Sequence, residues 1–215
     1  MAYSRGSSSN IIVGAAALFT FEGGELTDAD LPDLATTDAA KSAREALSDD
    51  ATFRNVGYTS NGLEISFEPD FGEVKVDQIL DVAKLYKQGM KVSLKTSFAE
   101  ATLENLLFAT AAADADLYTG TTGPFNGEQI LNLSAGNIGE CPVERGLVAV
   151  GPGTGDCAVG SSIERVYVAY RALSIESVTV SAKRDEATMF EVSFRLLPAD
   201  TGSYGKIVDR TIAAS

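Results

Sequence analysis

The sequence contains no histidine and no tryptophan, and it has only two cysteines in 215 residues. The absence of histidine excludes Ser–His–Asp and Cys–His catalytic groups and His-ligated zinc, and it removes the commonest general base at neutral pH. Two cysteines are too few for a four-cysteine metal site. Without tryptophan and with only seven tyrosines, a carbohydrate-stacking or antibody-like binding face is also disfavoured.

Basic residues are scarce as well. Seventeen Lys and Arg oppose thirty Asp and Glu, which gives a formal net charge of -13. Such a chain is soluble and self-repelling, and we do not expect it to bind nucleic-acid phosphates tightly. The hydrophobic fraction of 45% is sufficient for a sizeable core. We therefore expect a single folded domain over residues 1–215.

One apolar stretch, residues 11–21, has the length of a signal-peptide core. Only one charge, Arg5, precedes it, no convincing small-residue cleavage site follows, and it is too short to span a bilayer. We interpret it as a buried strand, and we expect synthesis in a cytoplasm without membrane insertion. In a cytoplasm the default for Cys141 and Cys157 is two free thiols. The alternative is a bond across a loop in an extracellular particle.

The dominant local pattern is alternation of apolar and polar residues with period two, which is typical of half-buried strands. It covers residues 63–68, 90–98 and 190–196. Asn61-Gly62 precedes the first of these stretches and predicts a type I′ hairpin turn, because both residues tolerate a positive φ.

A further strand pattern changes parity. Within residues 173–180 the apolar positions shift by one residue near Ser177, which predicts a bulge or a crossing between sheets. Further strands are expected at 128–135, 144–150, 163–171 and 207–213.

One helix stands out among the strands. Residues 97–100, Ser-Phe-Ala-Glu, fit a capping box, and Leu103, Leu106 and Leu107 follow at helical spacing. The helix is expected to run through residues 111–113. Many strands with one principal helix predict a mainly β fold, a β-sandwich or open barrel flanked by that helix.

An acidic loop is expected over residues 22–54. Its part 22–50 contains nine acids and two bases, so its net charge is -9 + 2 = -7, more than half that of the chain. Residues 39–47 can form a short helix, but the segment as a whole has the character of a long loop. Such a loop is either functional and mobile, or simply a solvated surface loop.

A glycine-rich loop is expected over residues 139–161. Its sequence Gly-Pro-Gly-Thr-Gly at 151–155 follows an apolar strand, as in a nucleotide-binding turn. The spacing is not G-x-G-x-x-G, no Walker lysine follows, and the next element has a strand pattern, so a hairpin loop is predicted. Asp28 and Asp30 lack the glycine and the distant glutamate of a calcium loop. We therefore predict no catalytic residues, no cofactor and no metal site.

Two stretches carry a resemblance to a known family. Residues 55–69 have a glycine–tyrosine hairpin pattern that ends in acid–proline, and residues 74–78 follow it. Residues 92–106 have a strand pattern that leads into F-A-E-A-T-L-E-N-L. With the apolar residues 10–19, these stretches resemble the major tail tube proteins of long-tailed (siphovirus-type) bacteriophages. The resemblance covers about residues 10–20 and 55–110.

The resemblance implies a structural virion protein without catalytic residues. Hexameric rings would stack into a hollow tail tube, with sheets joined around the lumen into a ring barrel, and the tube would conduct the genome into the host cell. The implied partners are other copies of the chain, a tape-measure protein in the lumen, and tail-tip and terminator proteins at the ends. DNA would pass without specific binding. The implied location is the virion tail, after synthesis in the host bacterial cytoplasm.

Two sets of acids are candidates within that assembly. A negative lumen would repel DNA, and the polar faces of residues 56–68 and 73–96 are candidates for its wall. Lys91 and Lys95 argue against an evenly acidic wall and suggest pairing with neighbouring subunits. The candidate lumen-facing residues are Glu64, Glu68, Glu73 and Asp77. The acidic loop is expected to reach an adjacent subunit or ring, so that its deletion impairs tube formation and leaves the monomer folded. Its candidate residues are Asp28, Asp30, Asp33, Asp49 and Asp50.

Three alternatives remain open at this stage. One is the inner tube of a contractile tail or injection system, which shares the fold. The second is another virion β-protein, such as a tail terminator or a capsid decoration subunit. The third is a soluble acid-dependent hydrolase, which would show a cleft with close carboxylates.

Overall fold

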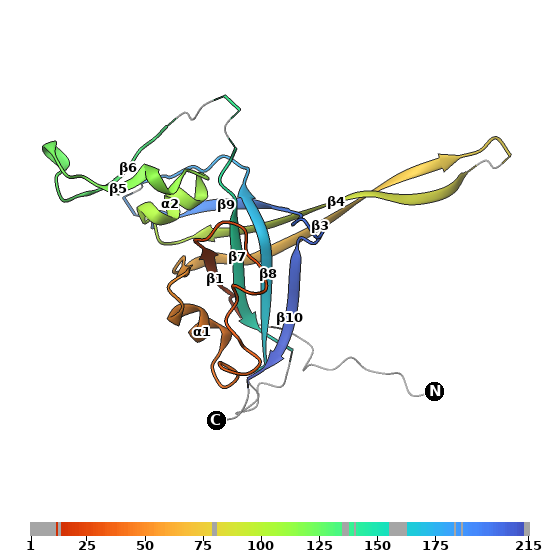
Figure 1. The fold of residues 1–215 in the computed structure, drawn as a ribbon. Helices are drawn as coiled ribbons and strands as arrows, with labels where there is room; N and C mark the ends of the chain where they lie inside the picture. The colour runs from red at the N-terminus through yellow and green to blue at the C-terminus, as the bar shows by residue number, and fades with distance from the viewer. Residues whose placement is uncertain are drawn as a thin grey trace.

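The computed structural model describes residues 12, 14–78, 81–134, 138–139, 141–154, 163–182, 184–185 and 187–212. These residues form a mainly β fold with two short α-helices, as the alternating sequence pattern predicts (Figure 1). The strands are β1 (Ala17–Phe21), β2 (Phe53–Asn55), β3 (Thr59–Lys75), β4 (Val82–Phe98), β5 (Leu117–Thr119), β6 (Gln129–Leu131), β7 (Arg145–Pro152), β8 (Ile163–Ser174), β9 (Phe190–Leu197) and β10 (Gly205–Thr211). The helices are α1 (Ala43–Asp49) and α2 (Leu103–Ala109).

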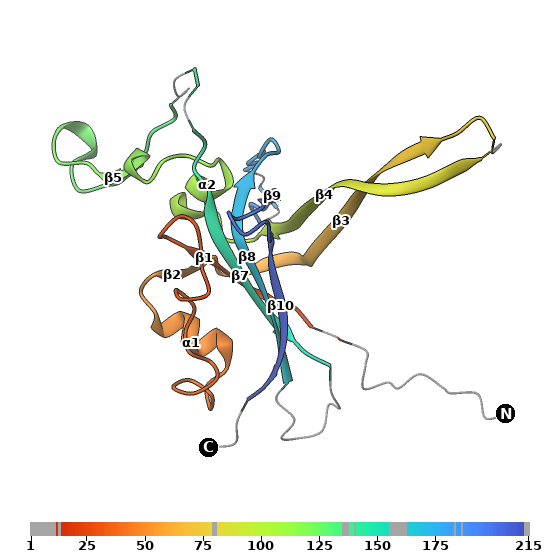
Figure 2. The ribbon, with the colours of Figure 1, turned by 45° about the vertical axis from the view of Figure 1, so that its right-hand side comes forward.

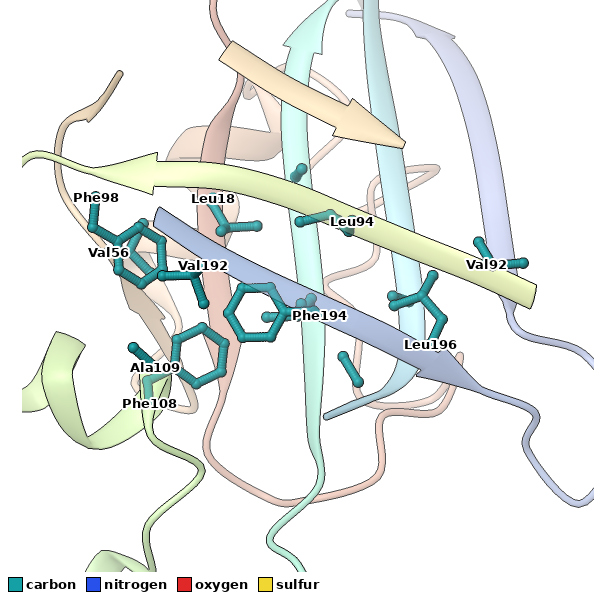
Figure 3. Packing of buried hydrophobic residues seen from close by; sticks show 14 of the residues in the cluster. Leu18, Val56, Val92, Leu94, Phe98, Phe108, Ala109, Val192, Phe194 and Leu196 are labelled. Atoms are coloured by element: carbon teal, nitrogen blue, oxygen red, sulfur yellow. The ribbon is translucent and has the colours of Figure 1, made fainter. Parts of the chain in front are cut away.

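Eight of these strands form one antiparallel sheet in the order β2-β1-β7-β8-β9-β4-β3, with β10 paired to β8 off this path. The sheet divides along β8. The first part of β8 pairs with β10, and its last four residues pair with β9. Because of this division, β9 and β4 cross in front of β1, β7 and β8 as a second layer (Figure 3).

The main core lies between these two layers. Phe98 is completely buried at its centre, and its ring contacts those of Phe108, Phe190 and Phe194 at centroid distances of 6.1, 5.6 and 6.5 Å. Leu18 of β1 contributes from the opposite layer (Figure 3). Helix α2 closes one end of this core with Phe108 and Ala109.

A second core lies on the other face of β1, β7 and β8. Phe19, Val148 and Val166 point into it, whereas Leu18, Leu147 and Ala149, which are chain neighbours of the first two, point into the main core. It is covered by the acidic loop, which contributes the buried side chains of Leu26 and Leu47. Strand β7 is therefore buried on both faces, which is why its sequence is a continuous apolar run rather than an alternating one.

The hairpin turn predicted at Asn61-Gly62 is wrong. Both residues have the predicted positive φ, 63° and 70°, but they lie inside β3. Three residues of β3 between Ser60 and Glu64 face the single residue Thr96 of β4, so β3 bulges at this point. The Thr96 hydroxyl donates to the Gly62 carbonyl at 2.8 Å and satisfies it. The chain turns instead between the end of β3 and the start of β4.

The predicted helix exists, but its predicted start and end are wrong. Ser97 and Phe98 are the last residues of β4, and α2 is capped by Thr102, whose hydroxyl accepts from the Asn105 backbone at 3.2 Å. The pairing of Phe98 with Phe190 in a fully buried setting outweighs the local capping preference. Glu100 does not cap the helix; its carboxylate accepts from the Tyr58 backbone at 2.8 Å.

Four further features predicted from the sequence can be compared with the structure. The expected bulge near Ser177 is wrong, because β8 ends at Ser174 and residues 175–182 form no strand. The glycine-rich loop does connect an antiparallel pair, β7 and β8, as predicted. A second helix, α1, lies within the acidic loop and begins at a Ser42–Glu45 capping box. Cys141 is exposed, and Cys157 lies outside the described residues, so the question of their pairing stays open.

Candidate assembly surface

The outer parts of β3 and β4 form a long two-stranded arm that projects from the body. We define the arm as residues 67–78 and 81–89; both ribbon views show it extending well beyond the crossed layers (Figure 1, Figure 2). In the described part of the chain β3 pairs with β4 alone, and β4 gains its second neighbour, β9, only from Val92 onward. The arm is thus supported by one ladder of hydrogen bonds.

The arm carries large apolar side chains that no described part of the chain covers. Phe71 is 54% exposed and Leu85 is 60% exposed, although residues of this kind are usually buried. The other exposed apolar residues of the arm are Phe67, Val74, Val76 and Tyr86. Isolated two-stranded hairpins are marginally stable in water, and contiguous exposed apolar side chains mark interaction sites. The arm therefore has the properties of a binding element.

The base of the same hairpin has a polar face with balanced charge. Glu64 and Glu68 point away from the main core, because Leu63 and Ile65, the two neighbours of Glu64, pack into it. Across the ladder Glu64 faces Lys95 and Glu68 faces Lys91, and the Lys91 ammonium lies 3.6 Å from the Glu68 carboxylate.

The two lysines of this face have partners within the chain. Lys91 pairs with Glu68, and Lys95 lies 3.4 Å from Glu176, beyond the end of β8. From the sequence, neighbouring subunits were the expected partners of Lys91 and Lys95. Both acids and both bases of the hairpin base thus contribute to a mixed-charge wall.

The four candidate lumen-facing acids do not form one row. Regular alternation along β3 places Glu73 on the opposite face of the ribbon from Glu64 and Glu68. Glu73 lies 3.4 Å from Lys75 on its own face, and Asp77 lies beyond the end of β3. One face of the hairpin therefore presents at most two of these acids at its base. Their position relative to a lumen stays a prediction.

Two long strands, β3 and β10, offer free edges, whereas the third end strand of the large sheet, β2, has only three residues. Among the described residues β10 is hydrogen-bonded to β8 alone, and β3 is hydrogen-bonded to β4 alone. An unpaired strand edge presents a row of backbone donors and acceptors to another chain. Ile207 on β10 is also 52% exposed. These edges are the natural sites for extending the sheet.

The candidate acids of the acidic loop bind within their own chain. Asp30 accepts from Thr27, Asp33 from Thr36, Asp49 from Lys41 and Asp50 from Thr52, so four of them stabilise local turns or flank α1. Hydroxyl donation by Thr36 holds the pKa of Asp33 below its ordinary value.

Asp28 connects two elements. Its carboxylate accepts from the Lys206 ammonium of β10 at 2.5 Å and from the Tyr170 hydroxyl of β8 at 2.9 Å. The hydrogen bond from Lys206, followed by that from Tyr170, lowers the pKa of Asp28.

A buried ion pair anchors the acidic loop, and sequence reasoning missed it. Glu164 of β8 and Arg210 of β10 lie 2.6 Å apart with side chains 8% and 10% exposed. The Glu164 carboxylate also accepts from the Ala43 backbone at 2.7 Å, at the start of α1, and Arg210 donates to the Ala39 carbonyl at 3.1 Å. The alternating pattern of β8 marks residue 164 as inward-facing, which is the one sequence signal for this pair.

The structure adds little chemistry to this surface. Within the described ranges no group of three or more Cys, Asp and Glu is arranged to hold a metal ion. No helix in this part of the chain is long and apolar enough to cross a membrane. Comparison with protein-family models and with curated protein sequences finds no match.

Proposed function

We propose that this chain is the repeating subunit of a phage tail tube, in which hexameric rings stack into a hollow conduit for genome ejection. The observation that carries the proposal is the arm, a projecting hairpin with uncovered apolar side chains. A protein that acts alone gains nothing from such an arm, whereas a subunit that repeats along a filament uses it to contact the next copy.

The free edges support the same proposal. Closed point-group assemblies need a surface and its complement on each copy. The edges of β3 and β10 belong to different branches of the sheet, because the sheet divides at β8. Pairing between such edges of adjacent subunits would continue a sheet around a ring without any refolding of the monomer.

The polar face at the base of the hairpin suits a conduit wall. A surface on which Glu64 and Glu68 alternate with Lys91 and Lys95 offers no cluster of cations for DNA phosphates. With a net charge of -13, the whole chain disfavours retention of nucleic acid. In this proposal DNA and a tape-measure protein pass the wall without specific binding, and tail-tip and terminator proteins bind the ends of the tube.

Removal of the apolar side chains of the arm tests the proposal. Wild-type protein, over a concentration series and with purified tail tips as seeds, is expected to give hollow filaments or stacked six-fold rings by negative-stain electron microscopy and light scattering. The double variant Phe71→Ser/Leu85→Ser should fold but assemble poorly. Phe125→Ser is the matched control, because Phe125 is 61% exposed but lies outside the arm. Normal assembly of the arm variant contradicts the role of the arm.

Two other outcomes point to the alternatives. Closed rings that never stack would favour a tail terminator or another virion ring protein. Persistent monomer in the presence of tail-tip seeds would overturn the tube proposal and return attention to an acid-dependent enzyme.

The lumen assignment has a separate test. Glu64→Cys, in a Cys141→Ser/Cys157→Ser background, is labelled in assembled tubes with a bulky maleimide. Protection from the reagent places residue 64 inside the tube or in an interface, and electron density for a smaller label distinguishes these two positions. Rapid labelling on the outer surface would show that the lumen assignment of Glu64 and Glu68 is wrong.

A further inference from the structure

A polar cavity of about 310 Å³ lies between α2 and the sheet, on the side of the molecule away from the arm. Strands β1, β2 and β7 supply one wall, and α2 with the start of β5 supplies the other. The cavity belongs neither to the arm nor to the free edges. Two guanidinium groups, those of Arg54 and Arg145, lie on its lining together with three carboxylates at Glu22, Glu104 and Asp114.

Arg145 is the unusual member of this lining. The residue is 6% exposed, and its Nε has no hydrogen-bond partner. On the same edge of the guanidinium, Nη2 donates to Asp114 and to the Ala112 carbonyl. An arginine can donate five hydrogen bonds and cannot shed its proton. A buried and unpaired donor on a charged group is costly, so the fold keeps it only if something accepts from it.

Arg54 brings a second positive charge to the same cavity. One of its nitrogens donates to the Asn105 side chain at 2.8 Å, which fixes the guanidinium against α2. Its Nε is 4.0 Å from the Glu22 carboxylate, beyond hydrogen-bond distance. Burial lowers the pKa of Arg54, and the charge of Arg145 acts in the same direction. The charges of Glu22 and Glu104 act on Arg54 in the opposite direction, and burial outweighs them.

The carboxylates of the lining do not fill this need. The Asp114 and Glu22 side chains are 67% and 56% exposed, so they lie at the rim in contact with water, where their repulsion of an anion is screened. Glu104 accepts from the Gln129 side chain at 2.5 Å, and this bond holds its pKa below the ordinary value. The guanidiniums lie deeper than these acids. An anion that accepts from the Arg145 Nε would therefore lie beside the Asp114 carboxylate, and the exposure of Asp114 to water weakens that repulsion.

We propose that this cavity binds a small oxyanion of the carboxylate or phosphate class, which accepts from the Arg145 Nε and from Arg54. An anionic oxygen is a strong acceptor for a charged guanidinium N–H, and such a group can offer one oxygen to each arginine. The cavity is large enough, because a water molecule in the liquid takes up roughly 30 Å³ and the site has room for an oxyanion with several waters. Two sources share this chemistry: a free anion, and an acidic side chain of another copy of the chain.

The arginine Nε–H signals of the ¹⁵N-labelled chain report on the site directly. Dilute, unassembled protein is titrated with sodium acetate and separately with sodium phosphate, with sodium chloride at matched ionic strength as the reference. Arg145→Lys identifies the Arg145 signal by its loss. Arg165 and Arg171 are internal controls, because their Nε atoms already donate to Asp209 and Glu144 at 2.5 and 2.6 Å.

The expected result is a saturable shift of the Arg145 and Arg54 signals, with Arg165 and Arg171 unchanged. Arg145→Lys should weaken the binding of acetate, followed at Arg54, about tenfold, the loss of one charge-assisted hydrogen bond. Arg165→Lys should leave that binding unchanged. Equal shifts at all arginines, or no saturation, overturn the proposal and assign the cavity to water alone.

A dilution series without added anion separates the two sources. A shift of the Arg145 signal that grows with protein concentration identifies a carboxylate from another copy, whereas a constant position with saturation by acetate identifies a free anion. Both results support the site. Because the titration uses unassembled chain, its outcome is independent of whether the protein forms tubes.

Discussion

Replacement of Arg210 by methionine is expected to destabilise the monomer strongly. The change leaves the Glu164 carboxylate, 8% exposed, with the hydrogen bond from the Ala43 backbone and without its cationic partner. Removal of one partner from a buried ion pair costs about 3–5 kcal/mol, because the other charge stays in a medium of low polarity. Domains of this kind are stable by about 5–15 kcal/mol in total, so the variant should lose a large part of its stability.

The double variant Arg210→Met/Glu164→Met distinguishes a stranded charge from lost packing. If the cost arises from the unpaired carboxylate, removal of both charges restores much of the stability, because apolar pairs of similar volume often replace buried ion pairs at little cost. The orphaned Ala43 amide at the start of α1 keeps the recovery incomplete. The costs of the single variants Arg210→Met and Glu164→Met, added together, should therefore exceed the cost of the double variant.

Urea unfolding of dilute protein, followed by circular dichroism, measures the free energy of unfolding of Arg210→Met, of Glu164→Met and of the double variant. Arg165→Met is the matched control: Arg165 pairs with Asp209 in the next register position of the same two strands, but that pair faces water. Its loss should have a far smaller effect. A cost below about 1 kcal/mol for Arg210→Met, or a double variant as unstable as the sum of the singles, would refute the reasoning.

Three further predictions concern stability. Asn105→Ala should cost about 3 kcal/mol in urea unfolding, because the buried side-chain amide makes hydrogen bonds to Val56, Glu100 and Arg54 at 2.8–3.0 Å. Asn126→Ala, at an exposed position, should leave the stability unchanged. Equal effects of the two substitutions would contradict this role of Asn105. The lowered pKa of Asp28 means that its contribution is fully present above its unfolded pKa, near 3.8, and is lost as the pH falls through the folded value. Unfolding of Asp28→Asn at pH 5 and pH 3 should therefore show a shallower pH dependence than wild type, and an identical slope would refute the assignment. Phe98→Ala should cost about 3–5 kcal/mol by the same assay, and a cost near 1 kcal/mol would mean that the core refills the space.

The turn predicted at Asn61-Gly62 shows which features of the fold a short stretch of sequence does not determine. Asn-Gly correctly predicts two successive residues with positive φ, because that preference is a property of the two residues themselves. Whether they form a turn or a bulge depends on which strand the following residues meet. Here β3 continues to pair with β4 from Glu64 onward, since the apolar residues on either side of Glu64 must reach the main core. Pairing partners are tertiary information and do not appear in a short window.

The packing role of the acidic loop is hidden in the sequence for a related reason. Its nine acids dominate its composition, but its role depends on the few apolar residues between them. Leu26 and Leu47 cover the second core, so the expected deletion that leaves a folded monomer would expose Phe19 and Val148 instead. The apolar run of β7 contained the relevant signal: a strand that is apolar at consecutive positions needs a cover on both faces.

The cavity beneath α2 was beyond sequence reasoning altogether. Arg54 and Arg145 are 91 positions apart and belong to no motif. They meet because β1 lies between β2 and β7 in the sheet, which follows from pairing rather than from composition. By contrast, the strands at 145–152 and 190–197 were predictable, because their apolar patterns are strong and local.

The contrast between the single ladder of the arm and the doubly covered β7 has a consequence for hydrogen exchange. Amides of the arm need only local fraying to exchange, so in the free chain they should exchange long before those of β7, which require the opening of both cores. Any partner that covers the arm would slow the first set of amides and leave the second unchanged. The ratio of the two exchange rates in a single sample would therefore measure how much of the arm is engaged, without any label and without a view of the assembly.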